Sequence, residues 1–261
     1  MFDLKNYLGD ENEKPLDRLV QDGGMCRIFR KIGCIGDSLS SGEHESLDEN
    51  GNKGFHDFYD YSWGQVLARN TGATVYNFSV GGLKAKDFIE GFADSRAVFN
   101  TDKLCQCYII ALGVNDLVVD KYVLGTVDDL DIKSPNKSKT TFAGYYGRII
   151  HKIKQAQKDA KIFLITLPNQ DEYPSYGMTK LLYDFSEKFD NTYCIDLEKY
   201  GPVYDAEFKK KFFVSGHMNA AGYVLSAQMI TSYIDYIIRH NLEEFSLTGF
   251  IGTPYTNINY K

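Results

Sequence analysis

A serine that could act as a nucleophile lies in the segment GDSLS at positions 36–40, directly after the apolar run IGCI at 32–35. The apolar run predicts a buried strand, and ligands of open parallel sheets bind outside the carboxyl ends of the strands. Gly36 lets the backbone turn tightly, which leaves the hydroxyl of Ser38 accessible. Ser38 is therefore a candidate nucleophile. The alternative is a simple turn in which glycine, aspartate and serine are only turn formers.

Three more polar segments carry residues that could assist a serine, namely NFSVGG at 77–82, GVND at 113–116 and HMNAAG at 217–222. The first two each follow an apolar run, at 73–76 and 108–112, that predicts a strand. Because the carboxyl ends of parallel strands meet at one edge of a sheet, we expect all these polar turns to converge there. The sequence thus predicts a single site at that edge.

Together with GDSLS, these segments cover positions 32 to about 222 and resemble, in type and order, the motif blocks of the SGNH (GDSL-type) hydrolase superfamily. The resemblance implies that Ser38 is the nucleophile and that His217 is the general base. It also implies that the main-chain N–H of Gly82 and the side-chain amide of Asn115 stabilise the oxyanion. A serine hydroxyl needs such a base, and histidine suits that task near neutral pH.

One expected residue is absent, because the family usually carries an aspartate three positions before the histidine and Val214 occupies that position here. Something else must then hold Nδ1 of His217. One candidate is a main-chain carbonyl near Val214 or Ser215, and the other is Glu43 or another acid of the segment 41–62. We favour the carbonyl, because it requires no ordering of a loop.

Alternating apolar strands and helical patterns indicate a parallel sheet crossed by helices. Steps of three and four from Phe142 to Ile153, and from Tyr223 to Ile237, predict helices with one buried face. The predicted fold is a flavodoxin-like three-layer α/β/α sandwich with a five-stranded parallel sheet, which the resemblance also implies. The strands are expected near 29–36, 73–79, 105–112, 161–167 and 192–197.

The chain of 261 residues has no evident linker, so we expect one domain over 1–261. Residues 1–26 are expected to form an N-terminal arm on that domain. The tail at 245–261 is expected to pack on the domain or on a partner copy in a homo-oligomer. The polar segment 41–62 follows the nucleophile, so it is expected to form a wall or lid in which Glu43 and His44 contact substrate. A solvated surface loop is the alternative.

Composition excludes several classes of protein. A formal net charge of -6 and a pI near 5.4 provide no basic field, so nucleic acid and membranes are not expected as partners. No basic region precedes an apolar stretch at the N-terminus, and we expect a cytoplasmic protein. The five cysteines mostly lie in or beside apolar runs, as reduced core cysteines do. No cofactor and no metal are expected.

These observations predict a serine esterase that removes short, acetyl-like acyl groups from a carbohydrate or other small polar molecule through an acyl-enzyme. Two alternatives remain open. The first is a thioesterase or acyltransferase that uses the same site. The second is a catalytically inactive binding module that has kept the fold and lost the orienting aspartate.

Overall fold

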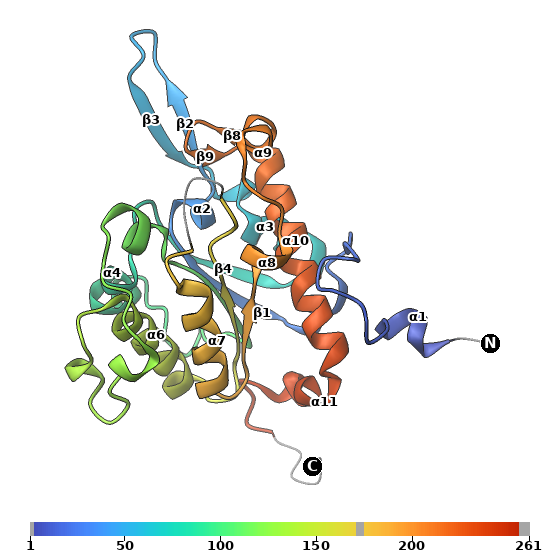
Figure 1. The fold of residues 1–261 in the computed structure, drawn as a ribbon. Helices are drawn as coiled ribbons and strands as arrows, with labels where there is room; N and C mark the ends of the chain where they lie inside the picture. Colours follow the sequence, from blue (N-terminus) through green and yellow to red (C-terminus); the bar gives the residue numbers. More distant parts are fainter. Residues whose placement is uncertain (1–2, 171–174, 256–261) are drawn as a thin grey trace.

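A five-stranded parallel sheet forms the centre of the computed structural model, which describes residues 3–170 and 175–255 (Figure 1). The predicted α/β fold is confirmed, and each observed strand lies within its predicted range. In spatial order the strands are β4 (Thr74–Ser79), β1 (Lys31–Gly36), β5 (Cys107–Ala111), β6 (Lys161–Ile165) and β7 (Thr192–Ile195).

Two helical layers cover the sheet because its strands carry apolar side chains on both faces. On β1, Ile35 faces a core formed with α6 (Phe142–Ala156) and α7 (Met178–Lys188). Ile32 and Cys34 face the opposite core, formed with α3 (Trp63–Thr71) and α10 (Ala220–His240). Figure 1 shows α6 and α7 on one side of the sheet and α10 on the other.

The two predicted helices are both present, and each begins at a capping residue. The Thr141 side chain accepts a hydrogen bond from the N–H of Gly144 at the start of α6, and Asn219 accepts one from Gly222 at the start of α10. The other helices are short: α1 (Leu4–Leu8), α2 (Ser38–Ser41), α4 (Ala85–Asp87), α5 (Ala93–Ser95), α8 (Leu197–Tyr200), α9 (Ala206–Phe212) and α11 (Leu242–Phe245). None of the described helices is long and apolar enough to cross a membrane.

The polar composition of the segment 41–62 predicts a loop. The structure instead shows an antiparallel hairpin of β2 (Glu43–Leu47) and β3 (Lys53–Asp57). The turn is stabilised by Asp48, whose carboxylate accepts hydrogen bonds from the N–H groups of Asn50 and Asn52. Figure 1 shows the hairpin projecting from the end of the molecule at which α2 lies.

A second, shorter hairpin lies at the base of the first. Its strands are β8 (Phe213–Val214) and β9 (His217–Met218), and Val214 pairs with His217. The turn between them contains Ser215 in a left-handed conformation, with φ of 59°. This tight turn fixes the backbone beside His217.

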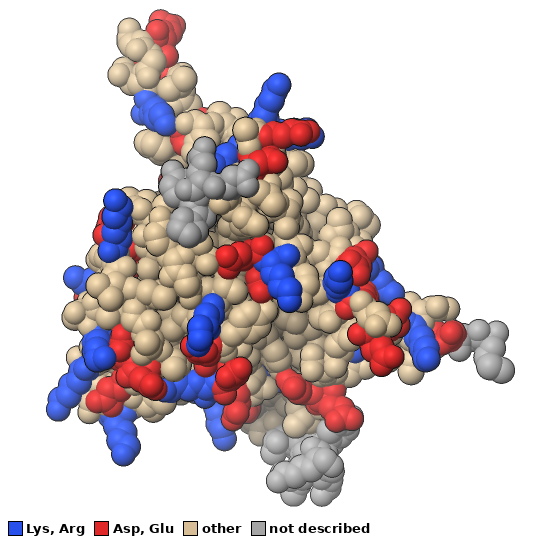
Figure 2. Space-filling model, viewed as in Figure 1, with Lys and Arg blue, Asp and Glu red and all other residues tan. Residues whose placement is uncertain are grey.

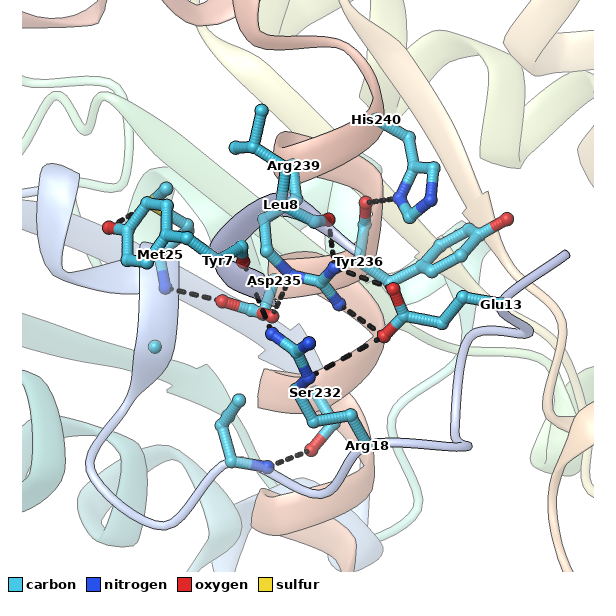
Figure 3. A network of polar contacts seen from close by, with 12 residues as sticks. Tyr7, Leu8, Glu13, Arg18, Met25, Ser232, Asp235, Tyr236, Arg239 and His240 are labelled. Atoms are coloured by element: carbon cyan, nitrogen blue, oxygen red, sulfur yellow. Dashed lines mark hydrogen bonds and ion pairs between the residues drawn. The ribbon is translucent and has the colours of Figure 1, made fainter. Parts of the chain in front are cut away.

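The N-terminal arm is held on α10 by a buried arginine (Figure 3). The Arg239 side chain is 3% exposed and binds the carboxylates of Asp235 and Glu13, each at 2.7 Å. This contact with Arg239 lowers the pKa of Glu13. The Ser232 hydroxyl also accepts a hydrogen bond from the N–H of Val20 at 3.0 Å. Residues 1 and 2 of the predicted arm lie outside the described residues.

The C-terminal segment lies against the amino ends of the strands. Phe245 is buried in the core shared with α10, and Lys161 lies over its ring. Gln106 donates a hydrogen bond to the carbonyl of Thr248 at 3.0 Å. Residues 256–261 of the predicted tail lie outside the described residues. All five cysteines are buried and form no disulfide, as predicted.

Candidate active site

The predicted site residues come from segments that end at one edge of the sheet. Gly36, at the end of β1, is level with Ser79 of β4 and Ala111 of β5. Ser38 therefore follows β1 at the same height at which Gly82 follows β4 and Asn115 follows β5. The short strand β9 brings His217 to this edge from the far end of the chain, where it contacts the hairpin strand β2.

The turn that carries Ser38 is fixed from several sides. Asp37 caps α2, and its side chain accepts a hydrogen bond from the N–H of Leu39 at 3.0 Å. Burial raises the pKa of Asp37 to about 7. The carbonyl of Ser38 accepts hydrogen bonds from the hydroxyls of Ser41 and Tyr223. A side chain at Gly36 would lie 2.1 Å from the Ser40 hydroxyl, so the close approach of strand and helix requires glycine there.

Two segments supply the predicted oxyanion donors: the turn that contains Gly82 and the short π-helix Val114–Val119, which contains Asn115. Gly82 has a φ of 73°, in the left-handed region that favours glycine, and the space where a side chain would lie is open. The Asn115 amide donates long hydrogen bonds of 3.3 Å to Asp37 and to the carbonyl of Leu83. Asp116 accepts a hydrogen bond from the N–H of Ala85 at 3.0 Å, which ties the segment of Asn115 to the segment that follows Gly82. Burial raises the pKa of Asp116 to about 7.

Nδ1 of His217 lies 2.7 Å from Oε1 of Glu45, and the Glu45 side chain is only 5% exposed. The same oxygen accepts a hydrogen bond from the N–H of Gly216 at 2.8 Å, and Oε2 lies 3.0 Å from Nζ of Lys53. Burial opposes ionisation, but the hydrogen bonds from His217 and Lys53 outweigh it and lower the pKa of Glu45 to about 2. Glu45 is thus a carboxylate positioned to orient the imidazole.

The expectation that a main-chain carbonyl near Val214 or Ser215 holds Nδ1 is therefore wrong. The segment 41–62 is ordered as a hairpin, and its strand β2 places the carboxylate of Glu45 beside Nδ1 of His217. Glu45 belongs to the other predicted group, the acids of that segment, although it is not among the predicted site residues. The signal that could have identified it is the alternation in Glu43-His44-Glu45, which puts two acids on one face of a strand.

The other ring nitrogen of His217 also faces an acid. Oε1 of Glu43 lies 3.0 Å from Nε2, and its side chain is mostly buried. Its second oxygen lies beside Gly81, because a side chain added there would meet Oε2 at 2.3 Å. Burial raises the pKa of Glu43, and the charges of Asp57 and Glu45 act in the same direction, although His217 opposes them.

The side chain of His44 points away from Glu43, Glu45 and His217, because successive side chains of a strand lie on opposite faces. Its Nδ1 lies 2.9 Å from the carbonyl oxygen of Gly42, and its ring packs among Phe58, Tyr61 and Tyr223. The structure thus brings Glu43 to His217 and does not bring His44 there.

An apolar cavity of about 340 Å³ opens beside the site. Its lining includes Leu39, Val114 and Gly216, each of which is the sequence neighbour of a predicted site residue. A smaller cavity of about 90 Å³ shares Leu39 and Val114 and extends toward Trp63 and Ile230. Ser38 itself is 8% exposed and lines neither cavity, so the cavities give an apolar group room beside its sequence neighbour Leu39.

A family model agrees with this geometry. The model of the GDSL-like lipase/acylhydrolase family matches residues 34–225, which contain Ser38, Gly82, Asn115 and His217. The chain belongs to this family and is an ester hydrolase of the GDSL/SGNH type. No curated protein sequence matches the chain.

Solved structures share the fold at low sequence identity. A family two carbohydrate esterase from Clostridium thermocellum, solved with cellohexaose, is 19% identical with a TM-score of 0.57, over 82% of this chain and 65% of that chain. A carbohydrate esterase family 2 enzyme with a carbohydrate binding domain from Corynascus thermopiles is 16% identical with a TM-score of 0.56. The match covers 78% of this chain and 65% of that chain. A possible lipase from Chitinophaga pinensis is 19% identical with a TM-score of 0.51, over 80% and 98%.

Proposed function

We propose that the protein hydrolyses short, acetyl-like acyl esters of a carbohydrate or other small polar molecule, with Ser38, His217 and Glu45 as a catalytic triad. The observation that carries this proposal is the buried carboxylate of Glu45 at 2.7 Å from Nδ1 of His217. A carboxylate in that position holds the imidazole in the tautomer that accepts a proton at Nε2 and stabilises the imidazolium that forms.

In the first half of the reaction, Oγ of Ser38 attacks the ester carbonyl while Nε2 of His217 takes the hydroxyl proton. The main-chain N–H groups of Ser38 and Gly82, and the amide of Asn115, receive the oxyanion. Removing one such donor typically costs a hundredfold to a thousandfold in rate. The proton on Nε2 then passes to the leaving oxygen, the carbon–oxygen bond breaks, and the alcohol departs.

In the second half, water attacks the acyl-enzyme and gives a proton to Nε2 of His217. The bond between Oγ of Ser38 and the acyl carbon breaks, and the proton returns to Oγ. The free acid leaves. The cavity beside Leu39 and Val114 supports a place for the acyl group, because its walls are mainly apolar.

Three further observations bear on this proposal. The alternative function, a catalytically inactive binding module, was suggested by the absence of an aspartate at position 214, which is Val214. Glu45 supplies a carboxylate to His217 and removes the reason for that alternative. The fold shared with a carbohydrate esterase supports a carbohydrate alcohol as the leaving group. Five buried cysteines without a disulfide support a reducing compartment such as the cytoplasm.

The test is covalent labelling of the purified protein with a fluorophosphonate, followed by peptide mass analysis and by assay with 4-nitrophenyl acetate. We expect the mass increase on Ser38, and we expect Ser38→Ala to lose both labelling and turnover while its melting temperature stays close to that of the wild type. The control is Ser95→Ala, which changes an exposed serine in α5. Wild-type turnover in purified Ser38→Ala would show that the nucleophile is a different residue.

A further inference from the structure

The carboxylate of Glu43 lies beside His217, the proposed general base. Its Oε1 is 3.0 Å from Nε2 of His217, the nitrogen that exchanges protons with Ser38 and with the leaving alcohol in the proposed reaction. Its Oε2 reaches the turn at Gly81, one residue before the predicted oxyanion glycine. An oxygen atom that exchanges a proton with Nε2, such as the leaving oxygen of an ester, must come within a similar distance of that nitrogen.

Among residues 3–170 and 175–255, His217 is the one basic side chain within ion-pair distance of the Glu43 carboxylate, and it is a cation only when both ring nitrogens carry protons. The nearby Lys53 is already bound to Glu45 and to the hydroxyl of Ser215. When an ester takes the place beside Nε2, the Glu43 carboxylate loses its partner while it remains mostly shielded from water. A shielded carboxylate without a donor is costly, so a substrate that brings a donor is favoured.

An aromatic ring stands on the same side of the site. Phe55 lies directly opposite Glu45 in the hairpin, so its side chain leaves the same face of the sheet as Glu43 and Glu45. Its ring makes a T-shaped contact with the His217 ring, with centroids 5.9 Å apart, and the residue is 56% exposed. The leaving-group side thus offers a carboxylate acceptor together with an exposed apolar ring, which suits an alcohol that has both hydroxyl groups and a C–H face.

We propose that Glu43 is a specificity-determining residue that selects esters whose alcohol carries a free hydroxyl on the carbon next to the acylated oxygen, as in mono-esters of diols and sugars. The inference rests on the proposed function. The neighbouring hydroxyl donates to the Glu43 carboxylate when the ester displaces it from Nε2. An ester of a plain alcohol displaces Glu43 without offering a donor in return.

The test compares two esters that differ only in that hydroxyl, cyclohexyl acetate and cis-2-hydroxycyclohexyl acetate. For the wild type we expect kcat/KM for the hydroxy ester to exceed that for the plain ester by at least about tenfold, as a hydrogen bond to a charged group allows. In Glu43→Ala this ratio should fall by about tenfold, and Glu43→Gln should lie between. The matched control is Glu49→Gln at the tip of the hairpin, which removes the same charge and should keep the wild-type ratio.

A second measurement separates this inference from the proposed function. A fluorophosphonate without hydroxyl groups forms a bond from Oγ of Ser38 to phosphorus, releases fluoride and passes the serine proton to His217. We expect Glu43→Ala to be labelled faster than the wild type, because no carboxylate has to leave Nε2. If the wild type is labelled but neither the ester ratio nor the labelling rate changes in Glu43→Ala, the inference is overturned and the proposed function stands. If neither the wild type nor Glu43→Ala is labelled on Ser38, both the inference and the proposed function are wrong.

Discussion

At the scale of single residues, burial opposes ionisation of the Glu45 carboxyl group, but the hydrogen bonds that it accepts outweigh burial and keep it ionised. We expect Glu45→Gln to lower kcat/KM by about 10³- to 10⁴-fold, because disabling the orienting acid of a related triad costs about 10⁴. The measurement is steady-state kinetics on 4-nitrophenyl acetate, with Glu49→Gln as the control for loss of one negative charge from the same hairpin. A loss below tenfold would contradict the triad.

Asp116 allows a pH test of the turn behind the oxyanion donors. Its folded pKa of about 7 is above the unfolded value of about 4. The protonated acid therefore stabilises the folded chain below about pH 4, and this contribution is lost as the pH rises to about 7. We expect Asp116→Asn to gain stability relative to the wild type between pH 4 and pH 7. Denaturant unfolding at pH 5 and pH 8 measures this gain, and Asp159→Asn, at an exposed position, is the control for the loss of one negative charge.

Sequence could indicate Ser38, Gly82, Asn115 and His217 because each belongs to a short local motif at the end of an apolar run or the start of a helix. Glu45 has no such local signature. Its role depends on contact with a residue 172 positions away, which only the docked hairpin brings near. The difference between Glu43 and His44 likewise depends on knowing that they lie in a strand, in which neighbours face opposite ways.

At the scale of elements, the five sheet strands and the two long helices were predictable because apolar side chains repeat along them with the period of each structure. The hairpin β2–β3 was not, because its strands are mostly polar and much of their surface is exposed. It is held instead by the Asp48 turn and by contacts of its base with β9. Polar strands that form no core leave little periodic signal in a sequence.

Lys53 joins the two hairpins, because its ammonium binds Glu45 of β2 at 3.0 Å and the hydroxyl of Ser215 at 2.9 Å. We expect Lys53→Met to lower kcat/KM by less than about tenfold, because the lysine is 54% exposed and solvated charges contribute little. The same ester assay measures the loss, with exposed Lys158→Met as the control. A loss as large as that of Glu45→Gln would mean that the lysine, and not the buried acid alone, sets the orientation of His217.

At the scale of the whole molecule, charges of both signs are spread over the face seen in Figure 2, without a large basic patch. This distribution agrees with the net charge of -6. A buried contact made by Arg239 joins the arm to α10. The arm carries no predicted site residue, so its contacts can be tested apart from catalysis.

Arg239→Met should destabilise the fold by about 3–5 kcal/mol, because it leaves the largely buried carboxylates of Glu13 and Asp235 without their partner. Arg27→Met is the matched control, since Arg27 makes an exposed ion pair with Asp22 at 3.5 Å and should cost less than about 1 kcal/mol. Urea unfolding measures both changes. Equal effects of the two substitutions would show that the buried ion pairs of Arg239 do not hold the arm on α10.

The proposed nucleophile and its acid, Ser38 and Glu45, lie in one short stretch of the chain, whereas His217 lies 172 residues beyond Glu45. During synthesis from the N-terminus, the ribosome therefore releases two members of the triad long before the third. The base reaches them only when β9 and α10 have emerged and docked, with Tyr223 bonded to the carbonyls of Ser38 and Glu43. If the proposed triad is correct, a nascent chain holds an inert serine until β9 and α10 have emerged and docked, and hydrolytic activity is expected only from that point.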